Sequence, residues 1–315
     1  MKRESILPQA LTVLVVAAMV GAAELLGEQE IIFPEIAAIA VGLLLAPRRA
    51  WMTNRLRVFA LIALSASLGL AISVCVPLPL WAKLACAFVL GQLVLICSGT
   101  GFAPLISAIV LPVLLGTRSL VYPAAAIALT ALILLMSLLL ERLGVRKAEP
   151  YHPVGLPERR DLPRVALRTA LGVLCIAAAV RLDVRFAAAP PLLVAFTELM
   201  NRESAARRRP FQAIALLSLC AALGVASRVV LSGWLGLPLT VAAAAAAAGM
   251  ILLLRGFHMF LPPAGALTVL AMLIPDSALG IYPTQVLLGS CAYMALAVLT
   301  NAADGALRRA GLHHT

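Results

Sequence analysis

Two short segments of the sequence, residues 97–104 and 255–265, place glycine, proline and polar side chains inside otherwise apolar surroundings. Glycine frees the backbone and proline lacks an amide donor, so both segments are typical of one helix ending and another beginning. The start of a helix offers free N–H groups and partial positive charge, which attract an anion. These segments therefore predict a site for a small solute, in particular an inorganic anion, formed by Thr100, Pro104, Arg255, His258, Pro262 and Pro263. The alternative is a pair of tight cytoplasmic turns in which Arg255 faces lipid phosphates.

Two carboxylates also lie inside apolar runs. Glu35 follows Phe33 and Pro34, and Glu198 lies beside Thr197. A carboxylate within a membrane is costly and is by default a candidate functional group, so we name Glu35 and Glu198 as candidates for proton coupling. The alternative is that both lie close enough to the membrane surface to be solvated or paired, since Arg202 or Arg207 could neutralise Glu198.

The composition indicates that these residues belong to a membrane protein. Of the 315 residues, 63% are hydrophobic and 12% are charged, and the mean hydropathy is +1.03. Soluble domains are nearer 45–50% apolar and about 25% charged. With only 5% aromatic residues, the chain suits membrane helices better than a β-barrel. We expect an all-α polytopic protein that contacts membrane lipid.

The hydropathy pattern predicts about twelve membrane helices in two sets of six. Four of them (31–46, 102–117, 186–201 and 260–275) are short for a full crossing, so they are expected to be tilted or broken. The remaining runs are 7–25, 58–76, 80–98, 120–140, 165–182, 211–231, 237–255 and 279–301. These runs divide the chain into a first membrane repeat (1–140), a cytoplasmic linker (141–164), a second repeat (165–305) and a cytoplasmic tail (306–315).

The positions of lysine and arginine indicate the orientation. With twelve crossings and both termini in the cytoplasm, 20 of the 25 basic residues fall on the cytoplasmic side, as the positive-inside rule requires. If 102–117 and 260–275 were re-entrant instead, the linker and the arginines at 202–209 would move outside. The net charge of +11 is therefore an orientation signal, and we expect no nucleic-acid partner. Lys2 and Arg3 also resemble the start of a signal peptide, but we expect the first run to remain as an uncleaved helix in a bacterial plasma membrane.

The two halves repeat each other in sequence. Tyr122-Pro123 recurs as Tyr282-Pro283, and Leu78-Pro79-Leu80 recurs as Leu237-Pro238-Leu239. Both halves have six runs and start on the same side, so the repeats are expected to be parallel. Transporters commonly place their substrate at such a repeat interface, where helices break.

A family resemblance lies in the second segment, in the run Leu261-Pro262-Pro263-Ala264-Gly265-Ala266-Leu267. This run resembles the signature of the HPP family of integral membrane proteins, in which His-Pro-Pro opens into Ala-Gly-Ala. Here Leu261 stands at the histidine position, and the nearest histidine is His258. The similarity covers roughly 186–301 and, more faintly, 31–140. The resemblance implies an all-helical membrane protein that transports a small ion such as an inorganic anion.

Enzyme motifs and cofactor fingerprints are not found in the sequence, so we expect a non-enzyme without cofactors. The prediction is a secondary transporter or channel for a small solute or ion. The alternatives are a non-transporting membrane scaffold and, third, an intramembrane lipid-modifying enzyme. The sequence leaves the oligomeric state open.

Overall fold

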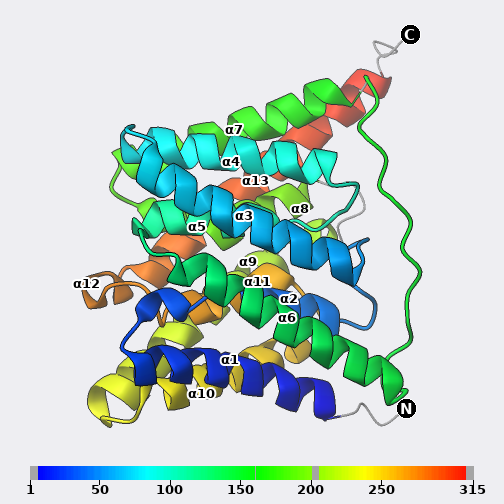
Figure 1. Ribbon diagram of the computed structural model, residues 1–315. Coiled ribbons are helices and arrows are strands. Elements are labelled where there is room, and N and C mark those ends of the chain that lie inside the picture. The colour runs from blue at the N-terminus through cyan, green and yellow to red at the C-terminus, as the bar shows by residue number, and fades with distance from the viewer. Residues whose placement is uncertain (1–5, 160, 201–205, 310–315) are drawn as a thin grey trace.

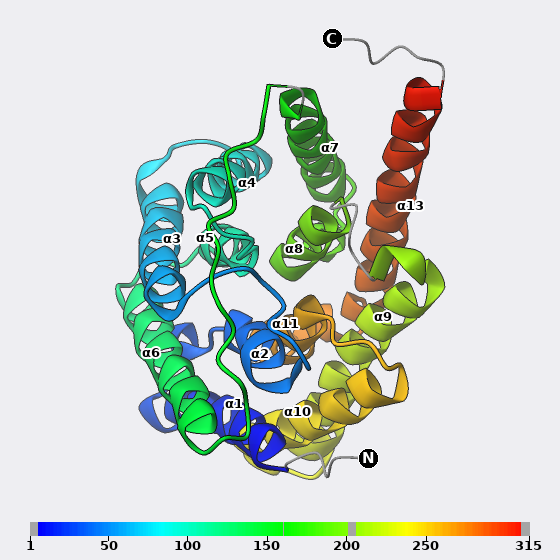
Figure 2. The same ribbon diagram turned by 90° about the vertical axis from the view of Figure 1, so that its right-hand side faces the viewer.

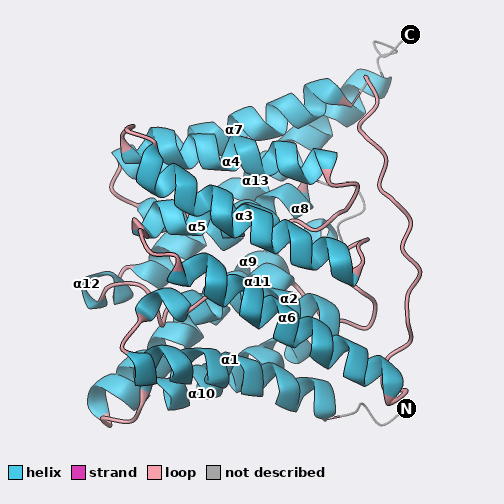
Figure 3. Cartoon of the chain, viewed as in Figure 1, coloured by secondary structure: helices cyan, strands magenta, loops and turns pink. Residues whose placement is uncertain are grey.

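A computed structural model describes residues 6–159, 161–200 and 206–309, with side chains described as far as Thr300 (Figure 1). Every regular element in these ranges is a helix, and no strand occurs in them (Figure 3). The expected all-α class is therefore confirmed. Lys2, Arg3, Arg160 and Arg202, on which part of the orientation argument rests, lie outside the described residues, as does the tail beyond Arg309.

Eight described helices are long and apolar enough to cross a membrane, which makes the chain a polytopic membrane protein. They are α1 (Leu7–Leu26), α3 (Arg55–Cys75), α4 (Leu80–Cys97), α6 (Val121–Arg142), α7 (Leu162–Arg181), α9 (Pro210–Ser227) with its π-helical continuation η5 (Arg228–Trp234), α10 (Leu239–Gly256) and α13 (Tyr282–Arg309).

The four short runs form four short helices. They are α2 (Glu35–Ala40) with its π-helical continuation η2 (Val41–Leu45), α5 (Pro104–Leu115), α8 (Pro190–Leu199) and α11 (Pro262–Leu270). The 12 residues of α5 extend over about 18 Å, whereas the hydrocarbon layer is about 30 Å thick. The remaining elements are the 3-10 turns η1 (Gln29–Ile31), η3 (Arg185–Ala188) and η4 (Ala206–Arg208) and the one-turn helix α12 (Asp276–Leu279).

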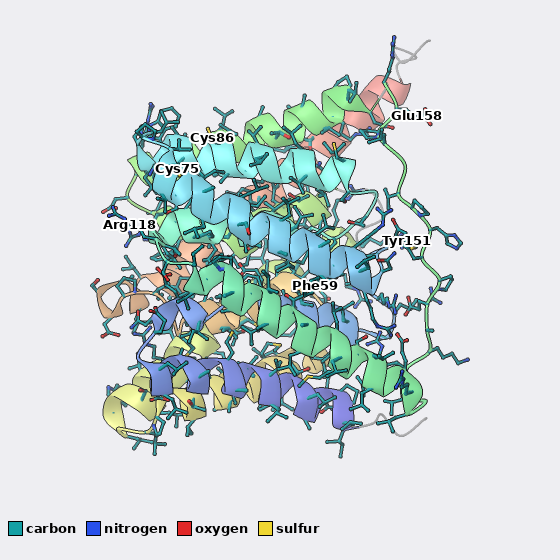
Figure 4. The ribbon with its side chains drawn as sticks, in the orientation of Figure 1. Phe59, Cys75, Cys86, Arg118, Tyr151 and Glu158 are labelled. Carbon is teal, nitrogen blue, oxygen red and sulfur yellow. The ribbon has the colours of Figure 1, made fainter. Side chains whose placement is uncertain are left out.

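The short helix α5 still leads the chain from one end of the molecule to the other. Just before it, the Gly99 carbonyl accepts a hydrogen bond from Tyr151 of the linker that joins α6 and α7 (residues 143–161). Just after it comes Arg118, which lies at the opposite end from Tyr151 and Glu158 (Figure 4). We call the end that carries Tyr151 and Glu158 the linker end.

The four short helices lie in the middle of the molecule, and the long helices surround them (Figure 2). α2 packs against α11, α11 against α8, α8 against α5, and α5 against α2. This closed arrangement, here called the short-helix ring, is made of two helices from each half of the chain. It is the most deeply buried part of the protein, because almost every side chain of these helices is buried.

Contacts in one half recur at matching places in the other half. Tyr122 donates a hydrogen bond to the Ala108 carbonyl of α5, and Tyr282 donates one to the Leu267 carbonyl of α11. The Tyr122 ring meets Phe33 edge-on, and the Tyr282 ring meets Phe186 in the same way. The recurring Tyr-Pro pairs in the sequence therefore mark recurring contacts in the fold.

The two halves are also interleaved. α1 packs against α10 of the second half, and α7 packs against α4 of the first half. At the far end of α1, the Glu24 carboxylate accepts hydrogen bonds from the Leu239 and Thr240 amides at 2.8 and 3.1 Å. A carboxylate at a helix N-terminus satisfies free amides and is favoured by the helix dipole. This contact fixes α10 beside α1, so α10 ends at the linker end, where α1 begins.

Candidate functional site

Glu35 is the first residue of α2 and is buried in the short-helix ring, with 1% of its surface exposed. The Ser107 hydroxyl of α5 donates a hydrogen bond to one oxygen of its carboxyl group. The second oxygen, Oε2, is buried and has no hydrogen-bond partner. Among the described residues, no basic side chain forms an ion pair with Glu35. The structure therefore places a carboxyl group with a free oxygen and no counter-ion at the contact between α2 and α5.

Glu198 lies in the last turn of α8, at the linker end of the ring. Its carboxylate accepts a hydrogen bond from the Trp51 indole N–H at 2.7 Å, across 147 residues of sequence. Trp51 lies in the loop after η2 and is itself buried. Arg202 or Arg207 was expected to neutralise Glu198. Arg202 lies outside the described residues, and the hydrogen bond that the structure shows for Glu198 comes from Trp51, a residue that the sequence pattern does not mark.

The Trp51 ring contacts residues that lie before it and after it in the first half of the chain. A Cβ atom at Gly42 would lie 2.3 Å from the ring, so only glycine leaves room for it there. On another side the ring meets Phe102 edge-on, with centroids 5.2 Å apart. Trp51 thus joins η2, the segment before α5, and the end of α8. π-helices such as η2 occur frequently at functional sites.

α8 makes a second polar contact with the first half of the chain. The Gln92 amide of α4 donates a hydrogen bond to the Thr197 hydroxyl at 2.8 Å, and both side chains are buried. Gln92 Oε1 has no hydrogen-bond partner. Gln92 Oε1 and Glu35 Oε2 are therefore two buried acceptors, and each could accept a hydrogen bond from a donor group.

The first break, between α4 and α5, is tightly packed. Gly99 adopts a left-handed conformation with φ +64°. The buried Thr100 hydroxyl is 2.8 Å from the Ser98 hydroxyl and accepts a hydrogen bond from the Phe102 amide. The linker lies across this break, because the Gly99 carbonyl accepts bonds from the Tyr151 hydroxyl and the Val154 amide at 2.7 and 2.9 Å. Thr100 is thus engaged in the turn.

The second break, between α10 and α11, is more open. Arg255 is half-buried in the last turn of α10, and His258 is exposed and left-handed, with φ +49°. Pro262 and Pro263 begin α11 and are buried. Of the six residues predicted to bind substrate, four therefore lie at this break and two at the first.

Neither helix start offers the free amides that an anion site needs. Pro262 and Pro263 have no N–H, and the Ala264 amide donates to the Leu261 carbonyl. At α5, Pro104 has no N–H and the Ile106 amide donates to the Ala103 carbonyl. This removes the physical basis on which an anion site was expected at these helix starts. The two starts are also separate, because α5 and α11 lie diagonally across the short-helix ring.

Within the described residues, no group of three or more histidine, cysteine, aspartate or glutamate side chains is placed to hold a metal ion. Comparisons of the chain with protein-family models, with curated proteins and with solved structures find no match. The resemblance to the HPP family therefore stays a prediction.

Proposed function

We propose that this chain is a secondary transporter for a small solute, built as two parallel repeats of six membrane segments with its site in the short-helix ring. The repeat is supported by the matching tyrosine and phenylalanine contacts and by the interleaved packing of α1 on α10 and α7 on α4. A full passage by α5 is supported by its path between the two ends of the molecule, and we extend it to the other three short helices to reach twelve passages. Repeat interfaces with interrupted helices are the usual position of a transport site.

The observation that carries the proposal is Glu35. An ionised carboxylate that is buried without a counter-ion costs several kcal/mol, so the neutral acid suits this position. Glu35 Oε2 is free to release or receive a proton when water or solute reaches it. Intramembrane carboxylates with this character mark proton and ion pathways. We assign the proton-coupling role to Glu35 first and to Glu198 second.

We place the mouths of the pathway at the two breaks at the linker end. Trp51 and Phe102 close the first mouth, and the hydrogen bond from Trp51 to Glu198 holds that closure against α8. Solute entering the ring would have to displace this contact. Inside the mouths, the proposed pathway is lined by Thr100, Pro104, Pro262 and Pro263. At the second mouth, the positive charge of Arg255 attracts an anionic solute.

We also propose how the chain is oriented in the membrane. Arg49, Arg55 and Arg57 lie near the linker, since Arg49 and Arg55 pair with Glu141 and Arg57 stacks on Tyr151. By the positive-inside rule this is the cytoplasmic side. We propose that the chain lies in a bacterial plasma membrane with both termini in the cytoplasm.

A non-transporting scaffold is the second candidate, because the first break is packed shut. An assay in liposomes separates the two. Purified protein is reconstituted with a pH-sensitive dye inside, and a panel of small anions and neutral solutes is added under a pH gradient. We expect one solute class to drive proton movement, Glu35→Gln to reduce that movement at least tenfold, and Glu28→Gln at the opposite end to leave it unchanged. Equal proton movement by wild type and Glu35→Gln contradicts the proposed role, and no solute-dependent movement at all supports the scaffold.

A further inference from the structure

An open hollow of about 480 Å³ lies at the linker end, between the start of α9 and the end of α10. It is lined by Arg209, Gln212, Leu252, Leu253, Gly256, Phe257 and His258. The hollow lies on the outside of the bundle, because the Leu252 side chain is 68% exposed. It is therefore separate from Glu35 and the short-helix ring.

The walls of this hollow combine two kinds of chemistry. Leu252, Leu253 and Phe257 supply an apolar wall at the end of a membrane-crossing helix. Arg209, Gln212 and His258 supply polar groups at the level where that helix ends. Within the described residues, these three side chains are exposed and have no hydrogen-bond or ion-pair partner. One guanidinium and two further hydrogen-bond donors beside an exposed apolar wall match a molecule that has a negatively charged head and a hydrocarbon tail.

The backbone places His258 in a position that the first half gives to glycine. Gly99 lies two residues after the end of α4, and His258 lies two residues after the end of α10. Both residues are left-handed, with φ values of +64° and +49°. Glycine adopts this conformation without a steric cost, whereas a residue with a Cβ does not. Residues in such strained conformations cluster at functional sites, so the His258 side chain is a candidate for a binding role.

We propose that this hollow binds the phosphate group of an anionic phospholipid. The Arg209 guanidinium and the His258 imidazole donate hydrogen bonds to phosphate oxygens, and one acyl chain lies along Leu252 and Leu253. Guanidinium groups match the geometry of phosphate, and basic pockets on the cytoplasmic side recognise anionic headgroups. The apolar wall favours a lipid over free phosphate. Phe257 and His258 also belong to the second break. Lipid binding there is measured without a transport assay, so it can fail or hold independently of the proposed transport function.

The test uses the full chain, purified in detergent and freed of lipid, with binding followed by native mass spectrometry. The probes are dioleoylphosphatidylglycerol, which is anionic, and dioleoylphosphatidylcholine, which is zwitterionic. We expect the wild type to bind the anionic lipid about tenfold more tightly, and Arg209→Gln and His258→Gly each to lower that affinity about tenfold, as the loss of one charged hydrogen bond predicts. Arg118→Gln, at the opposite end, and His152→Gly, in the linker, are the matched controls and should leave it unchanged.

His258→Gly suits the left-handed turn, so this variant is expected to fold, and Arg209→Lys keeps the charge and most of the affinity. Equal binding of the anionic lipid by the wild type, Arg209→Gln and His258→Gly overturns the site. Complete displacement of the lipid by an equal concentration of inorganic phosphate overturns the lipid as its occupant and identifies a free-phosphate site.

Discussion

At the scale of single residues, Glu35 and Glu198 each accept a hydrogen bond from a side chain in a distant part of the sequence. Glu35 and Glu198 stand out because a charged residue inside an apolar run is rare. Ser107, which binds Glu35, is 72 residues away, and Trp51, which binds Glu198, is 147 residues away. No local pattern encodes contacts over such distances, since they depend on how the short helices pack. Trp51 lies in a loop that periodicity does not describe.

The contact between Trp51 and Glu198 predicts a specific loss of stability. Trp51→Phe keeps an aromatic ring against Gly42 and Phe102 but removes the indole N–H, so the Glu198 carboxylate loses its hydrogen-bond donor. An acceptor left without its partner costs about 1–3 kcal/mol. We expect the free energy of unfolding, measured by detergent-denaturant titration, to fall by about that amount.

Trp234→Phe is the matched control, because Trp234 is 77% exposed. It should change the free energy of unfolding by less than about 0.5 kcal/mol, as for most surface substitutions. If both variants are equally stable, the hydrogen bond to Glu198 does not hold the closure of the first mouth.

At the scale of elements, the order of the runs and the two breaks were predictable from hydropathy, glycine and proline. All twelve apolar runs contain helices, and both breaks interrupt them. The anion-binding helix starts were expected from the general behaviour of N-termini, but the prolines and the amides of Ala264 and Ile106 leave few donors there. Which of the two breaks the linker covers could not be predicted, because it depends on the path of residues 143–161.

The Tyr151 hydroxyl helps to hold the linker over the first break. Tyr151→Phe removes the hydroxyl that donates to Gly99, while the Val154 amide still holds the same carbonyl. Losing one such bond costs about 1 kcal/mol, which raises the opened fraction of the linker about fivefold. We expect limited proteolysis within residues 147–159 to speed up by about that factor.

His152→Ala is the control for this change, because His152 is exposed and adjacent to Tyr151. It should be cut at the wild-type rate. Unchanged proteolysis of Tyr151→Phe would mean that the linker is held over the first break by contacts other than the Tyr151 hydroxyl.

At the scale of the whole molecule, the sequence predicted an all-α membrane protein, and its repeated motifs predicted two related halves. It did not predict how the halves combine. The packing of α1 on α10 and of α7 on α4 joins elements that are far apart in the chain. The short-helix ring joins the two halves in the same way, since α2 contacts α11 and α5 contacts α8. The buried position of Glu35 is a consequence of this arrangement.

The proposed transport requires that water and solute reach Glu35 within the ring. The most direct measurement is the reaction of Ser107→Cys with a membrane-impermeant thiol reagent, added from each side, in a chain whose six native cysteines have been replaced. Ser65→Cys is the control, because Ser65 is buried in α3 and has no hydrogen-bond partner. We predict that Ser107→Cys reacts, that a transported solute slows the reaction, and that Ser65→Cys stays unlabelled. If Ser107→Cys is as unreactive as Ser65→Cys from both sides, the ring is a closed core and the transport account is wrong.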